Sequence, residues 1–372
     1  MPVLLMVLMS LVSPDVMRLA EQPASQAIAD PSGQDEAQRT LDTIVLTAIE
    51  RWKDEATALD SAVSGICAAA PGNLPTAKTK ARAAWVASMK AWRAAAILPI
   101  RPWFSGQFAY SIDWPVVNAG LLSRSIDLFV PPPGTPTLSG HAPLLERSSV
   151  EVRGMNTLAY LLWQESASNA LSLEQTRTCS YAKLLAADLV QRADRLFHAS
   201  RSAPGAQGMR TNSKGASSTE ILLNAIVDGT RQLHKRYAAL SQGVLPQRMV
   251  STSDRFVELD GSRSNRSKEL LVASVDQLSR ALLGDEKLGV PGFVALLENG
   301  QSPDLPGKLR MLMETLNADA SRFPPGLSED NAEHRALAKQ FTDDAQSLLN
   351  QLTGPVAVAA GVLVGFGDGD GG

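Results

Sequence analysis

The chain has 372 residues, a formal net charge of −3 and a hydrophobic content of 44%, which is enough for a packed core. Its lysines and arginines are spread along the chain, whereas proteins that bind nucleic acid usually present a basic face, so we expect no nucleic-acid partner. Only 5% of the residues are aromatic, and alanine and leucine dominate, which favours helix over sheet.

Residues 1–36 are predicted to form a signal-like segment and a flexible leader. Val3 to Val12 form an apolar run with the length of a signal-peptide core, too short to span a bilayer. No lysine or arginine precedes this run, so either the true start lies upstream or the signal is atypical. The alternative is an apolar end of a cytosolic protein. We expect an exported protein whose mature chain has no transmembrane span.

Two long helices are predicted next. Apolar residues recur from Leu41 to Val63 at the three- and four-residue spacing of one buried helix face. Pro71 marks a turn, and the same spacing returns from about Thr76 to Leu98. We expect Trp85 and Trp92 of this second helix to lie in the core.

The connection from Pro99 to about Pro143 is rich in proline and glycine and is predicted to be irregular. A connection of this length tends to be functional when it is ordered. A third helix is predicted to begin near Ser149. A fourth is predicted to begin at Ser172, where Gln175 is placed to complete a capping box.

The stretch 202–218 is rich in glycine and serine and is predicted to be a linker between two domains. Ser217 and Glu220 form a further candidate capping box just at its end. Four more helices are predicted, at about 217–240, 267–283, 308–320 and 331–352. We therefore predict an all-α protein of two tandem helical-bundle domains, residues 37–201 and 219–372.

The chain contains two cysteines, Cys67 and Cys179. In an exported protein one disulfide between them is the natural expectation, and two buried free thiols are the alternative. A metal site with these two cysteines as its only ligands is not expected.

Five segments, in chain order, carry the functional information: AWVASMKAW from Ala84, IDWP from Ile112, VRGMNTLAYLLW from Val152, ELDGSRSNRS from Glu258 and GFGDGD from Gly365. Together they resemble the imelysin-like family, also called peptidase family M75, which includes iron-regulated imelysin-like proteins. The resemblance runs from about residue 40 to the C-terminus. The signature of the family is Gly-x-His-x-x-Glu, followed by an aromatic residue and a pair of leucines.

This signature is degenerate in the chain. Gly154 holds the glycine position, Asn156 the histidine position and Ala159 the glutamate position. Residues three apart lie on one helix face, about 5–6 Å apart at Cβ, so a His-x-x-Glu pair can hold one cation. Asn156 offers only a neutral amide oxygen, and Ala159 offers no ligand. The frame of the motif is kept, and both of its metal-binding side chains are missing.

We predict a ligand cleft between the two bundles, lined by Gly154, Asn156, Ala159, Trp114, Glu258, Ser262, Arg263 and Ser264. The last three precede a helix start near Ser267, and hydroxyls with an arginine at a helix N-terminus attract anions. Plain capping beside an exposed arginine is the alternative. In the tail, Asp368 and Asp370 alternate with glycine as in calcium loops, which makes them candidate metal ligands; a disordered acidic end is the alternative.

The resemblance implies a periplasmic role in iron uptake. It also implies an iron ion or another divalent or trivalent metal as cofactor, and periplasmic or membrane iron-uptake components as partners. Because the histidine and glutamate are missing, we expect a non-catalytic binding or accessory protein. One alternative is an M75-type metallopeptidase with ligands from elsewhere, such as Glu151, Glu258 or Asp368. The other is a structural or partner-binding helical module without a ligand.

Overall fold

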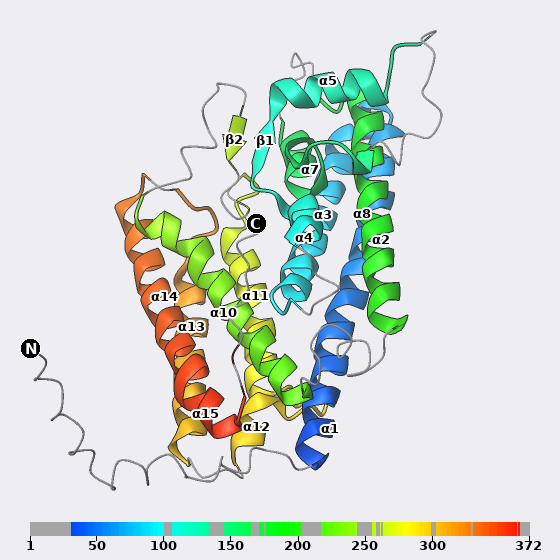
Figure 1. Ribbon diagram of the computed structural model, residues 1–372. Coiled ribbons are helices and arrows are strands. Elements are labelled where there is room, and N and C mark those ends of the chain that lie inside the picture. The colour runs from blue at the N-terminus through cyan, green and yellow to red at the C-terminus, as the bar shows by residue number, and fades with distance from the viewer. Residues whose placement is uncertain are drawn as a thin grey trace, which may run out of the picture.

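The fold is helical, as predicted. The computed structural model describes residues 31–99, 106–133, 145–164, 171–174, 176–202, 217–243, 255–257, 261, 263–298, 303–328, 330–362 and 364. Within these residues the only β-structure is one sheet of two short strands and one isolated bridge. Figure 1 shows the long helices in two groups that stand side by side.

The first group consists of three long helices and the short helix that carries the degenerate motif. In it, α2 packs against both α3 and α8, and α7 packs against α3 and α8. Trp85 and Trp92 are fully buried, as predicted, and the ring of Trp92 lies 4.6 Å from that of Trp52, centroid to centroid. The elements are α2 (Leu46–Cys67), α3 (Leu74–Ala96), a 3-10 turn (Val150–Val152), α7 (Gly154–Leu162) and α8 (Thr176–Ser202).

The prediction that residues 99–143 are irregular is wrong for the described part of this stretch. It contains α4 (Gly106–Asp113), β1 (Val116–Asn118) and α5 (Ala119–Phe129). Pro115 and the prolines from Pro131 lie outside these elements, whereas Gly106 and Gly120 lie in the first turns of α4 and α5. Short helices therefore form where the composition of the whole stretch indicated a loop. Asn118 caps α5 by accepting a hydrogen bond of 2.9 Å from the Leu121 amide.

The second group is built from four long helices. The rings of Tyr237, Phe323 and Phe341 meet in its core with centroids 5.3 to 5.8 Å apart. Ser217 caps α10 by accepting from the Glu220 amide at 3.1 Å, in agreement with the predicted helix start. The elements are α10 (Ser218–Ser241), α11 (Ser267–Leu283), α12 (Gly292–Glu298), α13 (Asp304–Arg322), α14 (Ala332–Gln351), a π-turn (Leu352–Val356) and α15 (Ala357–Ala360).

Two predicted boundaries need correction. Helix α8 begins at Thr176 and not at Ser172, because the Ser172 hydroxyl accepts from the Glu174 amide and closes a separate turn. The predicted leader overlaps α1 (Pro31–Thr40), which continues through a π-turn (Leu41–Val45) into α2 and packs against α10 and α12. Residues 1–30 lie outside the described part of the chain.

The two groups of helices are joined by direct contacts. Helix α3 packs along α11, and the Gln277 side chain donates to the Ile44 carbonyl oxygen at 2.9 Å. Strand β1 pairs antiparallel with β2 (Arg255–Val257), with Val117 opposite Phe256. Residues 203–216, most of the predicted linker, lie outside the described residues, so the domain boundary stays a prediction.

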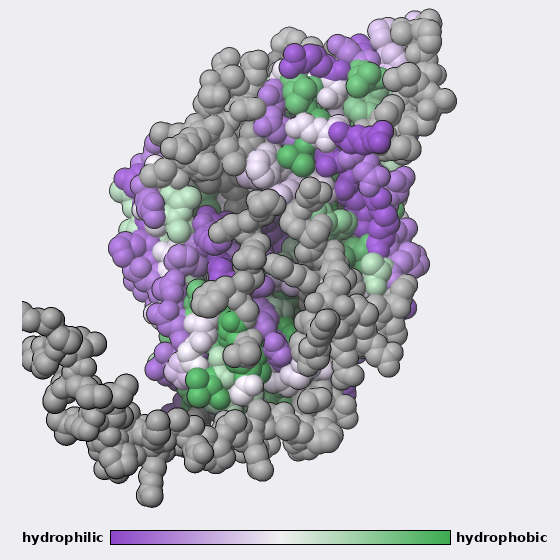
Figure 2. Space-filling view, in the orientation of Figure 1, coloured by the Kyte–Doolittle hydropathy of each residue, from purple (hydrophilic) through white to green (hydrophobic). Residues whose placement is uncertain are grey.

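The predicted disulfide between Cys67 and Cys179 is confirmed. It joins the last residue of α2 to the first turn of α8, with 5.6 Å between the two Cα atoms. Among the described residues, no helix is long and apolar enough to cross a membrane. Figure 2 shows that hydrophilic side chains predominate on the described part of the visible face.

The second group contains a buried acid whose ionisation affects stability. Asp319 of α13 is 6% exposed, and its carboxyl lies near that of Asp344 on α14. Burial first, and the neighbouring Asp344 second, raise the pKa of Asp319 from 3.8 to about 6, against the opposing effect of Arg322. The folded state therefore binds this proton more tightly than the unfolded chain.

We expect the free energy of unfolding to fall as the pH rises from about 4 to about 6, because ionised Asp319 destabilises the folded state. Asp319→Asn keeps the neutral form at every pH. It should stabilise the protein at neutral pH by about 2 kcal/mol and flatten this part of the pH profile. Urea melts across this pH range check the prediction, with the exposed Asp343→Asn as control. An unchanged profile in Asp319→Asn would contradict it.

Candidate functional site

Gly154, the glycine of the degenerate signature, stands where α7 meets the end of α4. Its φ is +80°, in the region that favours glycine. A Cβ atom added there would lie 2.5 Å from the carbonyl oxygen of Ile112 and 2.8 Å from that of Ser111. Glycine is therefore required at this position for a structural reason, because it allows the backbone of α7 to contact the last turn of α4.

This contact brings Asn156 against the residues that end α4. The Asn156 amide nitrogen donates to a carboxylate oxygen of Asp113 at 3.1 Å and to the carbonyl oxygen of Trp114 at 2.9 Å. Because both partners are acceptors, the amide nitrogen must face them, and the Asn156 carbonyl oxygen points the other way. This side chain is 4% exposed, and its carbonyl oxygen has no hydrogen-bond partner among the described residues.

Asp113 is also bound by Arg93 of α3. The guanidinium donates to both carboxylate oxygens, one of these bonds being 3.3 Å long, and the two side chains are 6% and 10% exposed. A buried, two-pronged pair of this kind is rigid, and losing one partner would leave the other charge buried and alone. Neither residue was predicted as part of the site. Asp113 lies in the IDWP segment, whereas Arg93 has no sequence signal that separates it from the other basic residues of α3.

Helix α4 is held from its other side by a second buried pair. Arg192 of α8 pairs with Asp188 one turn earlier at 2.6 Å, and the same guanidinium donates to the Ser111 hydroxyl at 2.6 Å. Both charged side chains are less than a tenth exposed. The last turn of α4 is thus fixed by α3, α7 and α8 together, which keeps Asp113 in place beside Asn156.

Two further residues of the predicted cleft lie in different surroundings. Ala159 is fully buried and packs in the core. Arg263 lies over the Tyr160 ring, 4.9 Å from its centroid, so the second half of the chain does reach the motif helix. Burial raises the pKa of Tyr160, and Arg263 opposes that shift.

The hydroxyl group of Ser264 is already hydrogen-bonded within the protein. The residue is buried, and its hydroxyl donates to the Gly261 carbonyl oxygen at 2.8 Å and closes the turn before α11. Trp114 is half-buried, and its indole nitrogen has no hydrogen-bond partner among the described residues. Glu258, Ser262, Asp368 and Asp370 lie outside the described residues, so their predicted roles stay predictions.

The residues around Asn156 do not fit a metal cation. Of the two motif positions, Ala159 has no donor atom and Asn156 has one neutral oxygen. The nearby carboxylate of Asp113 is already held by the guanidinium of Arg93, which places a positive charge beside the position that a cation would need. In the described part of the chain, no three His, Cys, Asp or Glu side chains gather in a way that could hold a metal ion.

Comparison with known proteins agrees with the fold. The chain is similar to an imelysin-like protein from Psychrobacter arcticum 273-4, with 16% identity and a TM-score of 0.65 over 91% of this chain and 99% of that one. It is also similar to a protein described as an iron-regulated protein A precursor from Parabacteroides distasonis ATCC 8503, with 16% identity and a TM-score of 0.62 over 88% of this chain and 95% of that one. No curated protein matches the sequence. The family model described as Peptidase_M75: Imelysin matches residues 45–357, and the chain therefore belongs to the imelysin family.

Proposed function

We propose that this chain is an exported, non-catalytic imelysin-family protein that serves iron uptake in the periplasm as a binding or accessory component. The observation that carries the proposal is the set of side chains at the degenerate motif. Asn156 and Ala159 replace the two metal-binding residues, and Arg93 holds the neighbouring carboxylate of Asp113. The frame of the family site is kept without the ligands that metal chemistry needs.

What the site offers is polar recognition. Two buried groups, the Asn156 carbonyl oxygen and the Trp114 indole N–H, have no hydrogen-bond partner among the described residues. A buried acceptor and a buried donor cost free energy unless something pairs with them. A small polar group of a ligand or partner that accepts from Trp114 and donates to Asn156 would remove this cost. A role connected with iron is supported by the name of the iron-regulated relative, and export by the word precursor in that name.

Two other functions make different predictions. An M75-type metallopeptidase with ligands such as Glu151, Glu258 or Asp368 would cleave peptides, and a chelator would abolish the cleavage. A structural module without a ligand would tolerate loss of the Asn156 amide as long as the protein stays folded. What favours the binding protein over the structural module is that two of the unpaired buried groups, one donor and one acceptor, belong to residues joined by a hydrogen bond at the motif.

Growth under iron limitation tests the proposal. A strain that lacks this protein should grow normally in iron-replete medium and poorly in iron-limited medium. The wild-type chain, recovered from the periplasmic fraction, should restore growth. Asn156→Ala should restore it poorly, because it removes both the unpaired acceptor and the bonds to Asp113 and Trp114. The exposed Asn350→Ala is the matched control. Equal growth in both media without the protein, or chelator-sensitive proteolysis by the purified protein, would overturn the proposal.

A further inference from the structure

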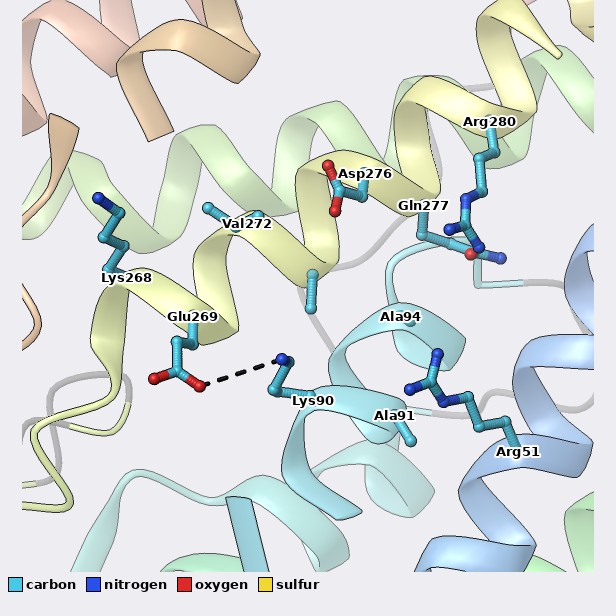
Figure 3. A pocket seen from close by; sticks show the side chains of 11 residues that line it. Arg51, Lys90, Ala91, Ala94, Lys268, Glu269, Val272, Asp276, Gln277 and Arg280 are labelled. Atoms are coloured by element: carbon cyan, nitrogen blue, oxygen red, sulfur yellow. Dashed lines mark ion pairs between the residues drawn. The ribbon is translucent and has the colours of Figure 1, made fainter. Parts of the chain in front are cut away.

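A groove outside the candidate site runs along the junction of the two groups of helices. It is formed by α2 and α3 of the first group and by α11 of the second, and it encloses about 330 Å³. This volume is at the small end of the range for ligand pockets. Figure 3 shows the side chains that line it; the charged ones are Arg51, Lys90, Lys268, Arg280, Glu269 and Asp276.

The charge of this groove is positive, although the whole chain has a formal net charge of −3. Four cationic side chains face two carboxylates. The pairing within the groove is weak: Lys90 lies 4.0 Å from Glu269, and Arg280 lies 3.4 Å from Asp285 outside the groove, with all but Asp285 more than a third exposed. Among the described residues, no carboxylate forms an ion pair with Arg51. The groove therefore contains more cationic side chains than its own carboxylates can neutralise.

Two guanidinium groups are placed to act on one ligand. Arg51 extends from α2 and Arg280 from α11 toward the same space, over the small side chains of Ala91 and Ala94 on α3 (Figure 3). Alanines at the floor leave room that larger side chains would fill. Arginine presents a planar fork of donors that matches carboxylate and phosphate groups two bonds at a time, so two arginines around one space fit a ligand with two such groups.

We infer that this groove binds a small oxyanion with two or more negative charges, either a polycarboxylate or a phosphate compound. Arg51 and Arg280 recognise its charged groups, and Lys90 adds a third cation. The ligand would bridge α2 and α3 to α11, so binding should tie the two groups of helices together and stabilise the folded protein. The inference does not depend on the proposed function, since none of its residues belongs to the site around Asn156.

The test uses the full chain, with citrate and pyrophosphate as probes, acetate as the singly charged control, and constant ionic strength. We expect saturable binding of citrate or pyrophosphate in isothermal titration calorimetry, a higher melting temperature, and no effect of acetate. The preferred probe tells whether the site selects carboxylates or phosphates. Arg51→Gln/Arg280→Gln should weaken binding by about tenfold or more, because it removes the charged donors. Both side chains lie at the surface, so this variant is expected to fold.

The matched control is Lys80→Gln/Lys308→Gln, which removes two exposed positive charges outside the groove. It should keep the wild-type affinity. If neither probe binds saturably, or if both double variants lose the same affinity, the effect is one of overall charge and the inference is wrong.

Discussion

Replacing both cysteines with serine is expected to lower the free energy of unfolding by about 4–5 kcal/mol. The disulfide closes a loop of 112 residues, and in the chain-entropy model a loop of this length restricts the unfolded chain by about that amount. It also fastens the end of α2 to the start of α8, so its loss should loosen the first group of helices. Chemical denaturation of wild type and Cys67→Ser/Cys179→Ser, each monitored by circular dichroism, measures the difference.

Wild-type protein under reducing conditions provides the control, because it should unfold like the double variant. The single variant Cys67→Ser should match it as well, since one cysteine alone cannot form the bond. A loss below about 1 kcal/mol in all three would show that the loop is already restricted in the unfolded state, contrary to this account.

Gly154→Ala is expected to cost about 3 kcal/mol or more. The methyl group would meet two backbone carbonyl oxygens of α4 at 2.5 and 2.8 Å, and the residue would also have to adopt a φ of +80°. Backbone cannot move aside as a flexible side chain can, so the last turn of α4 would have to shift. Asp113 and Trp114 would then be displaced from Asn156, and we expect the site to lose its geometry together with stability.

Gly65→Ala is the matched control for this prediction. Gly65 lies in α2 with nothing within 4 Å of an added Cβ, so alanine there should be neutral or should stabilise the helix by up to about 1 kcal/mol. Thermal melts of both variants give the comparison. Equal stability of the two variants would mean that the contact between α7 and α4 is not as close as the structure has it.

The sequence was sufficient for the helical fold and for the frame of the site. Apolar spacing identified α2 and α3, because each buries one continuous face, and helices were also predicted where α10, α11, α13 and α14 lie. The short elements α4, α5 and β1 were missed, since segments of three to eleven residues carry too little periodicity. The glycine of the motif was identified by resemblance to the family. The need for glycine there comes from contact with the Ser111 and Ile112 carbonyl oxygens, and the sequence does not show that these segments pack together.

The charge of the site could not be predicted for the same reason. Asp113 and Arg93 are 20 residues apart on different helices, and no sequence spacing pairs them. Without Arg93, Asp113 would look like a ligand that replaces the lost glutamate. The ion pair is a further argument against metal binding at this place, and only the folded arrangement reveals it.

Restoring the motif provides a reference for that conclusion. Asn156→His/Ala159→Glu places both side chains of the family signature on one face of α7, although Ala159 is fully buried and a glutamate there has to displace its core neighbours. If the frame of the site is intact, this variant should gain affinity for zinc or iron, although the nearby guanidinium of Arg93 works against a bound cation. The variant therefore shows what metal binding at this position looks like in the same assay.

The measurement that tests the central claim most directly is the metal content and thermal stability of the wild-type protein. Elemental analysis is combined with melts in the absence and presence of ferric, ferrous, zinc and calcium ions, with Asp368→Asn/Asp370→Asn as a control for the acidic tail. We expect no stoichiometric metal and no shift in melting temperature. About one equivalent of bound metal that survives in the tail variant, with a melt raised by mass action, would contradict the account.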